Sequence, residues 1–129
     1  KEYLMIGFVM VGTNNLKEAS KFYDKILSSI ELVQVFSTGK CIGYAPNNKK
    51  NKIEFYITQP INQKEATYGN GTQISFLVNS RDLVDRFYTK AIKIGAKNQG
   101  APGPRPSNSS SYYCYIRDLD GNKICVYSD

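Results

Sequence analysis

The segment NKICVY at residues 122–127 is nearly a copy of NKIEFY at residues 51–56, and this repetition decides the fold. Both segments are rich in residues that favour strands, so each is predicted to be a short β-strand. In the second copy Cys125 stands where the first copy has Glu54, so a carboxylate is exchanged for a thiol. The repeat raises two questions: why one strand occurs twice, and what chemistry the exchange removes.

The similarity extends to the rest of the chain. The offset that aligns Phe22 with Phe87 also aligns Phe8 with Gln73. A sequence that repeats at a fixed offset predicts two copies of one structural unit, and a unit this small cannot bury its sheet alone. A chain of 129 residues is one domain by its length. We therefore expect a single domain over residues 1–129 with two modules, at about 4–62 and 72–128.

Each module is predicted to contain one strand, one helix and three further strands, which is an α+β arrangement. The helices are indicated by apolar residues that recur at spacings of three and four, and the strands by short runs of β-branched and aromatic residues. Residues 98–111 hold three of the five prolines, so we expect this segment to be mostly irregular. The predicted helices are 15–28 and the segment between Ser80 and Gly95, and the predicted strands are 4–11, 31–36, 40–45, 52–58, 72–79, 112–118 and 122–128.

Composition excludes several classes of protein. The chain has no histidine, which removes Ser-His-Asp triads, HExxH zinc sites and other sites that use imidazole as base or ligand. Its three cysteines are odd in number and have no CxxC spacing, so neither a disulfide framework nor a thiolate zinc site is indicated. The apolar run at 4–11 is too short to span a bilayer, which takes about 20 residues. We expect a soluble protein of the reducing cytoplasm with no membrane partner.

The net charge of +6 raises the question of nucleic acid binding. Lys17, Lys21 and Lys25 are predicted to lie on one side of the first helix, but a lysine stripe opposite an apolar stripe is typical of any solvated helix. A basic module for nucleic acid ranks last among the functions considered, because no strand has the aromatic and arginine spacing that base stacking needs. We expect no nucleic acid partner. A pocket that favours anions is the milder interpretation.

Alternation along the strands separates a face for the helices from a face for a ligand. One side of the first and last strands of each module is apolar, as at Val9 and Phe55, and is predicted to lie under the helices. The other side mixes polar and aromatic groups, as the wall of a small-molecule site does. This side carries Phe8, Glu54, Tyr56, Gln73, Cys125 and Tyr127.

Several motifs resemble the vicinal oxygen chelate superfamily, which contains the glyoxalases, the bleomycin resistance proteins and the extradiol dioxygenases. They are the two βαβββ repeats, GAPGPRP at 100–106 and the RDLDGN hairpin at 117–122, and the resemblance covers about 4–128. It implies mixed sheets that curl into a cup, with the helices on the outer face, and it implies a homodimer. In metal-binding members four ligands lie in the cup, and the resemblance assigns their positions to Phe8, Glu54, Gln73 and Cys125.

These positions depart from the metal-binding pattern. Phe8 has no lone pair to donate, and one thiol beside the oxygen donors of Glu54 and Gln73 is a poor set for a single divalent ion. The exchange of Glu54 for Cys125 is thus interpreted as the loss of a metal ligand. We expect a glyoxalase-like protein that binds a small organic molecule, with no metal or other cofactor, for sequestration, resistance or sensing.

The alternative is an enzyme of the glyoxalase I type. It would be a metal-dependent lyase or a glutathione-linked transferase, with Glu54 as base and Gln73 as metal ligand. The sequence leaves open whether the chain catalyses any reaction.

Further side chains complete the predicted site. Arg105 and Arg117 could hold an anionic group through two parallel hydrogen bonds, so the ligand could be an anion, with surface salt bridges as the alternative role. Cys125 is expected to be a small buried group rather than a reactive thiol. Tyrosines that could stack on a ligand or bond to it, with strand packing as the alternative, are Tyr56, Tyr113, Tyr115 and Tyr127.

Overall fold

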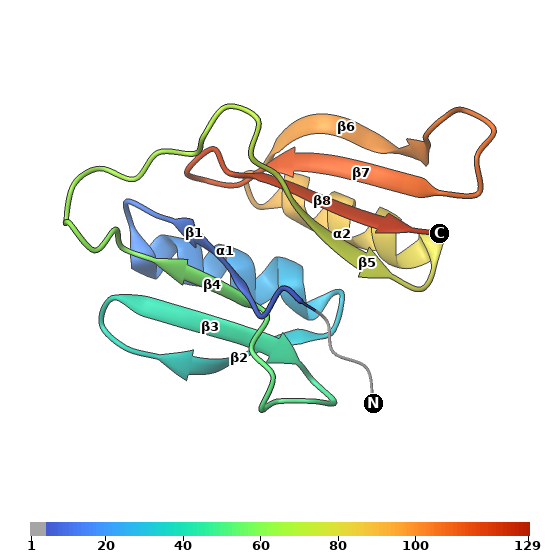
Figure 1. The fold of residues 1–129 in the computed structure, drawn as a ribbon. Helices are drawn as coiled ribbons and strands as arrows, with labels where there is room; N and C mark the ends of the chain where they lie inside the picture. Colours follow the sequence, from blue (N-terminus) through green and yellow to red (C-terminus); the bar gives the residue numbers. More distant parts are fainter. Residues whose placement is uncertain (1–4) are drawn as a thin grey trace.

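The structure, a computed structural model, describes residues 5–129 and contains two mixed four-stranded sheets that lie side by side (Figure 1). In the first sheet the strand order is β1-β4-β3-β2. β1 runs parallel to β4, and the other neighbours are antiparallel. The strands are β1 Val9–Gly12, β2 Leu32–Ser37, β3 Cys41–Pro46 and β4 Phe55–Thr58.

The second sheet repeats this arrangement as β5-β8-β7-β6, again with one parallel pair, β5 with β8. The predicted α+β fold of two βαβββ modules is confirmed. The module limits of about 4–62 and 72–128 stay a prediction, and residue 4 lies outside the described residues. The strands are β5 Ile74–Val78, β6 Lys97–Pro104, β7 Tyr112–Arg117 and β8 Lys123–Ser128.

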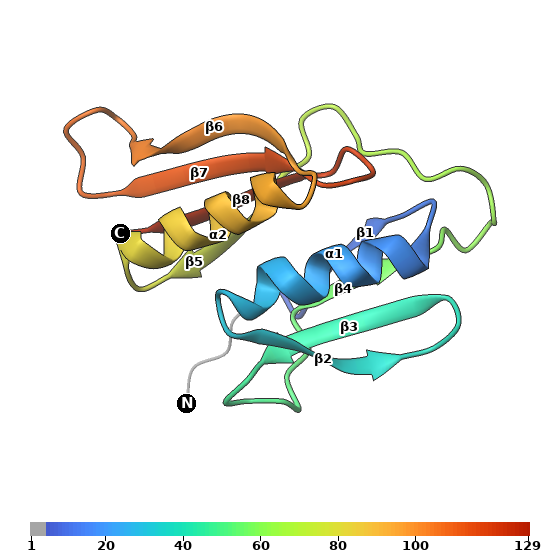
Figure 2. The same ribbon diagram turned by 180° about the vertical axis from the view of Figure 1, so that it is seen from behind.

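One helix covers each sheet, as the periodicity of the sequence predicts. α1 spans Leu16–Ser28 and α2 spans Arg81–Lys93. α1 begins where the Asn15 side chain accepts a hydrogen bond from a backbone amide of the first turn, and Ser80 caps α2 in the same way. Seen from behind, both helices lie on the same side of the sheets (Figure 2). No helix among residues 5–129 is long and apolar enough to cross a membrane.

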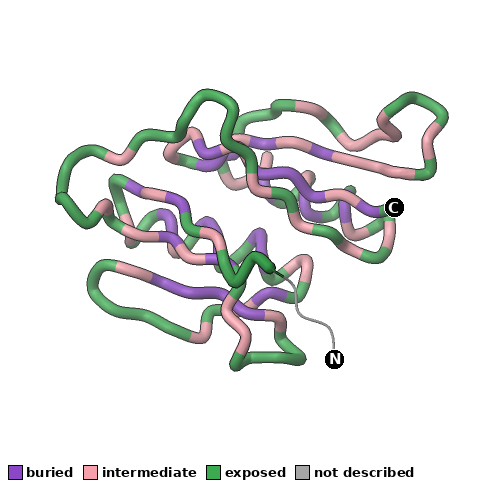
Figure 3. Tube along the Cα trace, in the orientation of Figure 1, coloured by how far each residue is buried: buried purple, intermediate pink, exposed green. Residues whose placement is uncertain are grey.

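The core lies between the helices and the sheets, and burial alternates along the strands (Figure 3). Phe55 and Ile57 of β4 face the helices and are 0% exposed. Met10 and Leu77 point to the other side and are 48% and 60% exposed. Alternation along the sequence predicts these two faces, and burial agrees with it. The side of each sheet that no helix covers is called the open face below.

The prediction that residues 98–111 are mostly irregular is wrong for their first half, which forms strand β6. The strand pairs with β7 but carries two irregularities in register, on either side of Gly100. A side chain at Gly100 would come within 2.8 Å of the Tyr115 ring, so the tight approach requires glycine. β6 is an edge strand, where proline and bulges are tolerated. Composition alone signals a loop here, whereas pairing with β7 supplies the strand.

The largest errors at the N-terminal ends of the other predicted strands are in the first and last strands of the first module. The strand predicted at 4–11 begins at Val9, and the strand predicted at 52–58 begins at Phe55. In both cases the preceding residues are exposed or half-buried and extend past the paired region. Phe8 and Glu54 therefore lie just before the N-terminal ends of β1 and β4, which are neighbours in the sheet.

Within the described residues, the two sheets share no hydrogen-bonded strand pair, so other contacts hold the modules together. The main polar contact is Asp118, in the RDLDGN hairpin between β7 and β8. The Tyr23 hydroxyl of α1 donates to its carboxylate at 2.5 Å, and the Asn122 side chain donates to the same oxygen at 2.9 Å. Asn122 also donates to the Gly12 carbonyl of β1 at 3.0 Å. Charge-assisted hydrogen bonds of this kind are about twice as strong as neutral ones.

Neighbouring contacts extend this junction. The backbone amide of Asn14 donates to the carboxylate of Asp120 at 2.9 Å. On the apolar side, the rings of Phe55 and Phe76 meet edge to face with centroids 5.4 Å apart. The hairpin of the second module is therefore fastened to the first helix and the first strand of the other module.

Replacing Tyr23 by phenylalanine removes the hydroxyl donor to Asp118. Burial raises the pKa of Asp118 above its ordinary value, and the Tyr23 hydrogen bond opposes that rise because it favours the ionised carboxylate. In the variant this pKa rises further, so more stability is lost as pH rises through it. We expect Tyr23→Phe to lower the free energy of unfolding by about 1.5–3 kcal/mol at neutral pH, and by less as Asp118 becomes protonated in mild acid. Urea unfolding at both pH values measures the difference.

Tyr112→Phe is the matched control, because the Tyr112 hydroxyl donates to Asp85 at 2.7 Å on the exposed surface. This variant should change the free energy of unfolding by no more than about 0.5 kcal/mol. Equal losses for the two variants, or a loss for Tyr23→Phe that does not vary with pH, would contradict the role given to Asp118.

Candidate functional site

Two of the four positions that the resemblance assigns lie together on the first module. Phe8 and Glu54 stand side by side, because the Val9 amide donates to the Glu54 carbonyl at 3.0 Å. Phe8 is 56% exposed and packs edge to face on Tyr56, with ring centroids 5.0 Å apart. The side chain of Glu54 is exposed. Lys52, which the sequence places nearby, donates to the Gly7 carbonyl at 2.6 Å.

The other two positions lie on the second module. The Gln73 side chain is exposed and donates to the Ser75 hydroxyl at 3.0 Å. Ser75 lies directly opposite Cys125 in the β5–β8 pair. Cys125 belongs to the open face, yet neighbouring side chains cover it completely, and burial raises the pKa of its thiol. The expectation of a buried, unreactive cysteine agrees with this placement.

These four side chains do not fit a divalent metal. Phe8 offers no lone pair, and the raised pKa of Cys125 disfavours the thiolate that a metal requires. Only Glu54 and Gln73 could donate oxygen, whereas a catalytic site normally needs three protein ligands. Within residues 5–129, no three His, Cys, Asp or Glu side chains lie close enough together to hold an ion. These four side chains by themselves therefore do not make a metal-binding donor set.

Three of the predicted tyrosines meet on the open face of the second sheet, and we call them the tyrosine group: Tyr113, Tyr115 and Tyr127. Tyr113 lies opposite Tyr127, and their stacked rings are 5.0 Å apart at 10°. Tyr113 and Tyr115 are 6.1 Å apart and parallel within 1°. All three rings are half-buried, so part of their surface is accessible. The fourth tyrosine, Tyr56, lies on the first sheet with Phe8.

Arg105 lies beside the tyrosine group, but most of its donors form hydrogen bonds to backbone carbonyls. Its guanidinium donates to the carbonyls of Ala101, Gly103 and Tyr113 at 2.8–3.1 Å. The carbon of the guanidinium lies 5.3 Å from the centre of the Tyr115 ring. Arg105 therefore fixes the irregular end of β6 to β7. It keeps its positive charge for a ligand, but few free donors for a pair of parallel hydrogen bonds.

The donors of Arg117 are likewise used in hydrogen bonds within the protein. It donates to the Gly121 carbonyl at 2.9 Å and to the Gln99 side chain at 3.2 Å. The ring of Tyr68 covers it at 5.3 Å. Neither arginine forms the surface salt bridge that the sequence offered as the alternative; within the described part of the chain, the ion pairs are Lys21 with Glu18 and Arg86 with Asp82.

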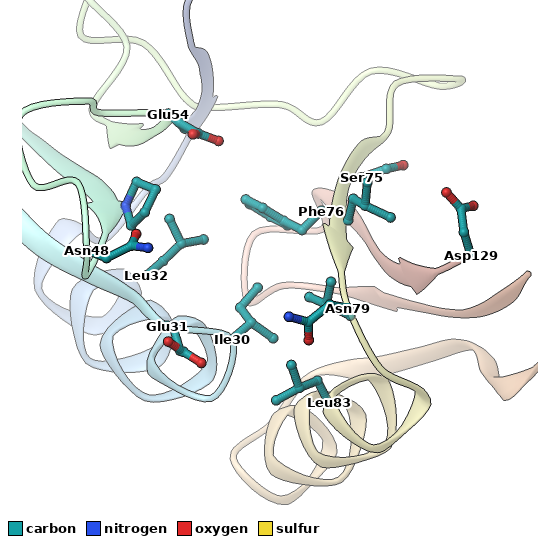
Figure 4. A pocket seen from close by; sticks show the side chains of 13 residues that line it. Ile30, Glu31, Leu32, Asn48, Glu54, Ser75, Phe76, Asn79, Leu83 and Asp129 are labelled. Atoms are coloured by element: carbon teal, nitrogen blue, oxygen red, sulfur yellow. The ribbon is translucent and has the colours of Figure 1, made fainter.

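A cleft of about 790 Å³ lies between the two modules, at the end of β8 opposite to Asp118. Glu54 lies on one side of it, and Phe76 and Asp129 lie on the other (Figure 4). Among residues 5–129, its walls combine apolar side chains with carboxylates and include no basic side chain. The residues that define this character are Ile30, Leu32, Phe76, Leu83, Glu31, Glu54 and Asp129.

The structure thus brings the predicted residues together in two groups rather than one. Glu54, Phe8 and Tyr56 belong to the first sheet, and Glu54 shares the cleft with Ser75 of the second sheet. The tyrosine group, Arg105, Gln73 and Cys125 belong to the second sheet. Sequence reasoning left Ser75 and Lys123 out of the site, although strand alternation already put them on the same side as Gln73 and Cys125. It missed the apolar walls of the cleft, because residues such as Ile30 and Leu83 look like ordinary core positions.

Comparison with known proteins assigns the family. The profile of the Glyoxalase/Bleomycin resistance protein/Dioxygenase superfamily matches residues 5–126. The chain belongs to this superfamily. A glyoxalase/bleomycin resistance protein from Albidiferax ferrireducens T118 has a similar crystal structure, with a TM-score of 0.86 and 34% sequence identity over 98% of this chain and 99% of that one. The resemblance inferred from the motifs is confirmed.

Two more distant members share the fold. The lactoylglutathione lyase from Agrobacterium tumefaciens has a TM-score of 0.68 at 17% identity, over 99% of this chain and 96% of that one. The fosfomycin resistance protein FosX from Mesorhizobium loti has a TM-score of 0.68 at 15% identity, over 100% of this chain and 93% of that one. No curated protein sequence matches this member of the superfamily.

The bonds of Arg105 to three carbonyls predict a structural role that can be tested. Arg105→Lys keeps the charge but loses the planar fork of donors. We expect the free energy of unfolding to fall by about 1–3 kcal/mol, because three carbonyls, two of them in part-buried bonds, lose a charged donor. Arg86→Lys, at an exposed ion pair, is the control and should change the value by about 0.5 kcal/mol at most. Equal values for the two variants in urea unfolding would show that Arg105 does not hold β6.

Burial also predicts how the three cysteines react with a thiol reagent. Burial raises the pKa of Cys114 to about 12 and raises that of Cys125, whereas Cys41 is half-buried. One thiol should therefore react in the native protein, and the other two only after unfolding. Cys41→Ser should remove the fast phase. Fast reaction of a second thiol in that variant would contradict the packing around Cys125.

Proposed function

We propose that this superfamily member binds a small organic molecule in the region between and over its two open faces, without a catalytic metal. The observation that carries the proposal is a ligand-sized cleft bordered by Glu54, together with a set of side chains at Phe8, Glu54, Gln73 and Cys125 that lacks the donors of a metal site. Binding without turnover suits sequestration, resistance or sensing. The similarity to a glyoxalase/bleomycin resistance protein at 34% identity supports this group of functions.

Glu54 has a central role in this proposal. Its carboxylate is exposed, borders the cleft and has no cation within 4.0 Å among residues 5–129. A carboxylate beside apolar walls attracts a hydrogen-bond donor or a positive group of a ligand. Phe8 and Tyr56 lie next to it and supply aromatic surface. Across the cleft, Ser75 offers a hydroxyl that can donate or accept.

The second candidate is an enzyme of the glyoxalase I type, a metal-dependent lyase or a glutathione-linked transferase. The fold shared with lactoylglutathione lyase and the exposed carboxylate of Glu54 favour it. In that case Glu54 would act as base and Gln73 would ligate the metal. The buried thiol of Cys125 and the ring of Phe8 argue against it, because neither can complete the coordination.

We further propose that the protein works as a homodimer in the reducing cytoplasm. Two large apolar side chains that are not assigned to the ligand, Met10 and Phe36, stand exposed on the open face of the first sheet and would be covered by a second copy. The three unpaired cysteines suit a reducing compartment. Sedimentation velocity would measure the assembly state directly.

A thermal-shift screen of metabolites and planar antibiotics, with and without a chelator, tests the proposal. A true ligand at a hundred times its Kd adds about 2.7 kcal/mol of stability. We expect at least one ligand whose shift survives chelation, and less than one equivalent of Zn, Ni, Mn or Fe in the purified protein. A full equivalent of metal that survives dialysis, with binding that chelation abolishes, would support the enzyme instead.

Glu54→Gln is the sharpest variant for the same screen. It keeps the size of the side chain and removes its charge, so the shift should disappear if the carboxylate holds the ligand. Glu65→Gln, an exposed carboxylate in the linker between the modules, is the matched control and should leave the shift unchanged. An unchanged shift in Glu54→Gln would assign Glu54 a structural role.

A further inference from the structure

Three basic side chains lie in a row across the open face of the second sheet. Lys97 of β6 lies directly opposite Arg117 of β7, and Arg117 lies directly opposite Lys123 of β8. Like charges in directly opposed positions destabilise a sheet. Among residues 5–129 no carboxylate lies within 4.0 Å of any of the three. The sheet therefore holds a concentration of positive charge that the protein itself does not neutralise.

The row adjoins the tyrosine group, and two cations converge on one of its rings. The ammonium of Lys123 lies 5.1 Å from the centre of the Tyr115 ring. The guanidinium of Arg105 lies 5.3 Å from the same centre, and its bonds to backbone carbonyls hold it there. Two like charges near one ring repel each other, so a negative group placed close to either of them would be stabilised.

The neighbouring rings form a parallel aromatic stack, and its accessible part can contact the rest of a ligand. Tyr113 and Tyr127 are stacked 5.0 Å apart, are nearly parallel and are half-buried. Tyr113 lies 6.1 Å from Tyr115, the ring that both cations approach. A flat aromatic molecule can stack on the accessible part of such a group whatever its polar substituents.

We propose that the ligand of this protein is a planar aromatic anion. Its ring lies against Tyr113 and Tyr127, and its carboxylate or phosphate group lies near Lys123 and Arg105. This inference rests on the proposed function and narrows it, because it names the class of ligand and the module that binds it. The acidic cleft at Glu54 then lies next to the bound ring and is suited to polar substituents on the far side of the molecule.

The experiment is isothermal titration calorimetry with three probes that separate charge from ring stacking. 2-Naphthoate carries both features, 2-naphthalenemethanol lacks the charge, and cyclohexanecarboxylate lacks the aromatic ring. We expect 2-naphthoate to bind at least about tenfold more tightly than either of the others, and its Kd to rise with added salt. Equal binding of the neutral alcohol, or no heat from 2-naphthoate at all, would overturn the proposal.

Two substitutions locate the probe on the sheet. Lys123→Gln should raise the Kd of 2-naphthoate about tenfold, and Tyr127→Leu should do the same by removing the stacking surface. Lys90→Gln, at an exposed lysine of α2 on the other side of the molecule, is the control and should leave the Kd unchanged. If Lys123→Gln and Lys90→Gln behave alike, the basic row is not the binding surface. Circular dichroism of each variant checks that the fold is kept.

Three further outcomes separate this inference from its rivals and from the proposed function. An oligothymidylate that binds more tightly than 2-naphthoate, and displaces it, would overturn the small-molecule ligand in favour of single-stranded nucleic acid. If the thermal-shift screen finds only neutral or cationic ligands that depend on Glu54, the proposed function stands and this inference fails. If no compound of any charge shifts the protein, both fail.

Discussion

The placement of the two modules depends on the carboxylate of Asp118. The sheets do not pair with each other within the described residues, so their relative position is set by packing between the helices and by this junction. One carboxylate oxygen receives the Tyr23 hydroxyl from the first module and the Asn122 side chain from its own hairpin. The other oxygen receives backbone amides of the hairpin, so the turn and the module contact share a single acceptor group.

This arrangement explains why the cleft and the junction lie at opposite ends of β8. At the start of β8 the hairpin bonds to the first module. Asp129, just beyond the other end of β8, borders the cleft. The open faces stay side by side as a consequence (Figure 1). The proposed ligand would use this arrangement by binding to the second sheet with the acidic cleft beside it. A carboxylate is costly to bury unless it is bonded on several sides, and Asp118 meets this condition.

Much of the fold follows from the sequence. The copied strand and the aligned Phe22 and Phe87 indicate two modules, and helical spacing gives both helices nearly to the residue. The sequence cannot reveal β6, since Gly100 and three prolines read as a loop until β7 is placed beside them. Local patterns describe a segment by its own composition, whereas an edge strand is decided by its neighbour.

The site is less predictable than the fold, for a related reason. Alternation places Gln73, Cys125 and Tyr127 on one face, but it says nothing about depth, and Cys125 proves to be fully covered. The row of Lys97, Arg117 and Lys123 depends on strand register around two irregularities in β6, which no spacing in the sequence encodes. The sequence suggests that Arg105 grips an anion through two parallel hydrogen bonds, but its carbonyl partners take up most of the donors and leave mainly its charge for a ligand. Contacts between distant segments, rather than residue types, decide these roles.

The most direct test of the account is a double-mutant cycle between Tyr23 and Asp118, measured by urea unfolding at neutral pH. The cycle uses Tyr23→Phe, Asp118→Ala and the double variant, so the bonds that Asp118 makes within its own hairpin cancel. The account predicts a coupling free energy of at least about 1.5 kcal/mol, as expected for a buried hydrogen bond to a charged group. A coupling near zero would show that the hairpin does not fasten the modules, and the shared position of the open faces would lose its physical basis.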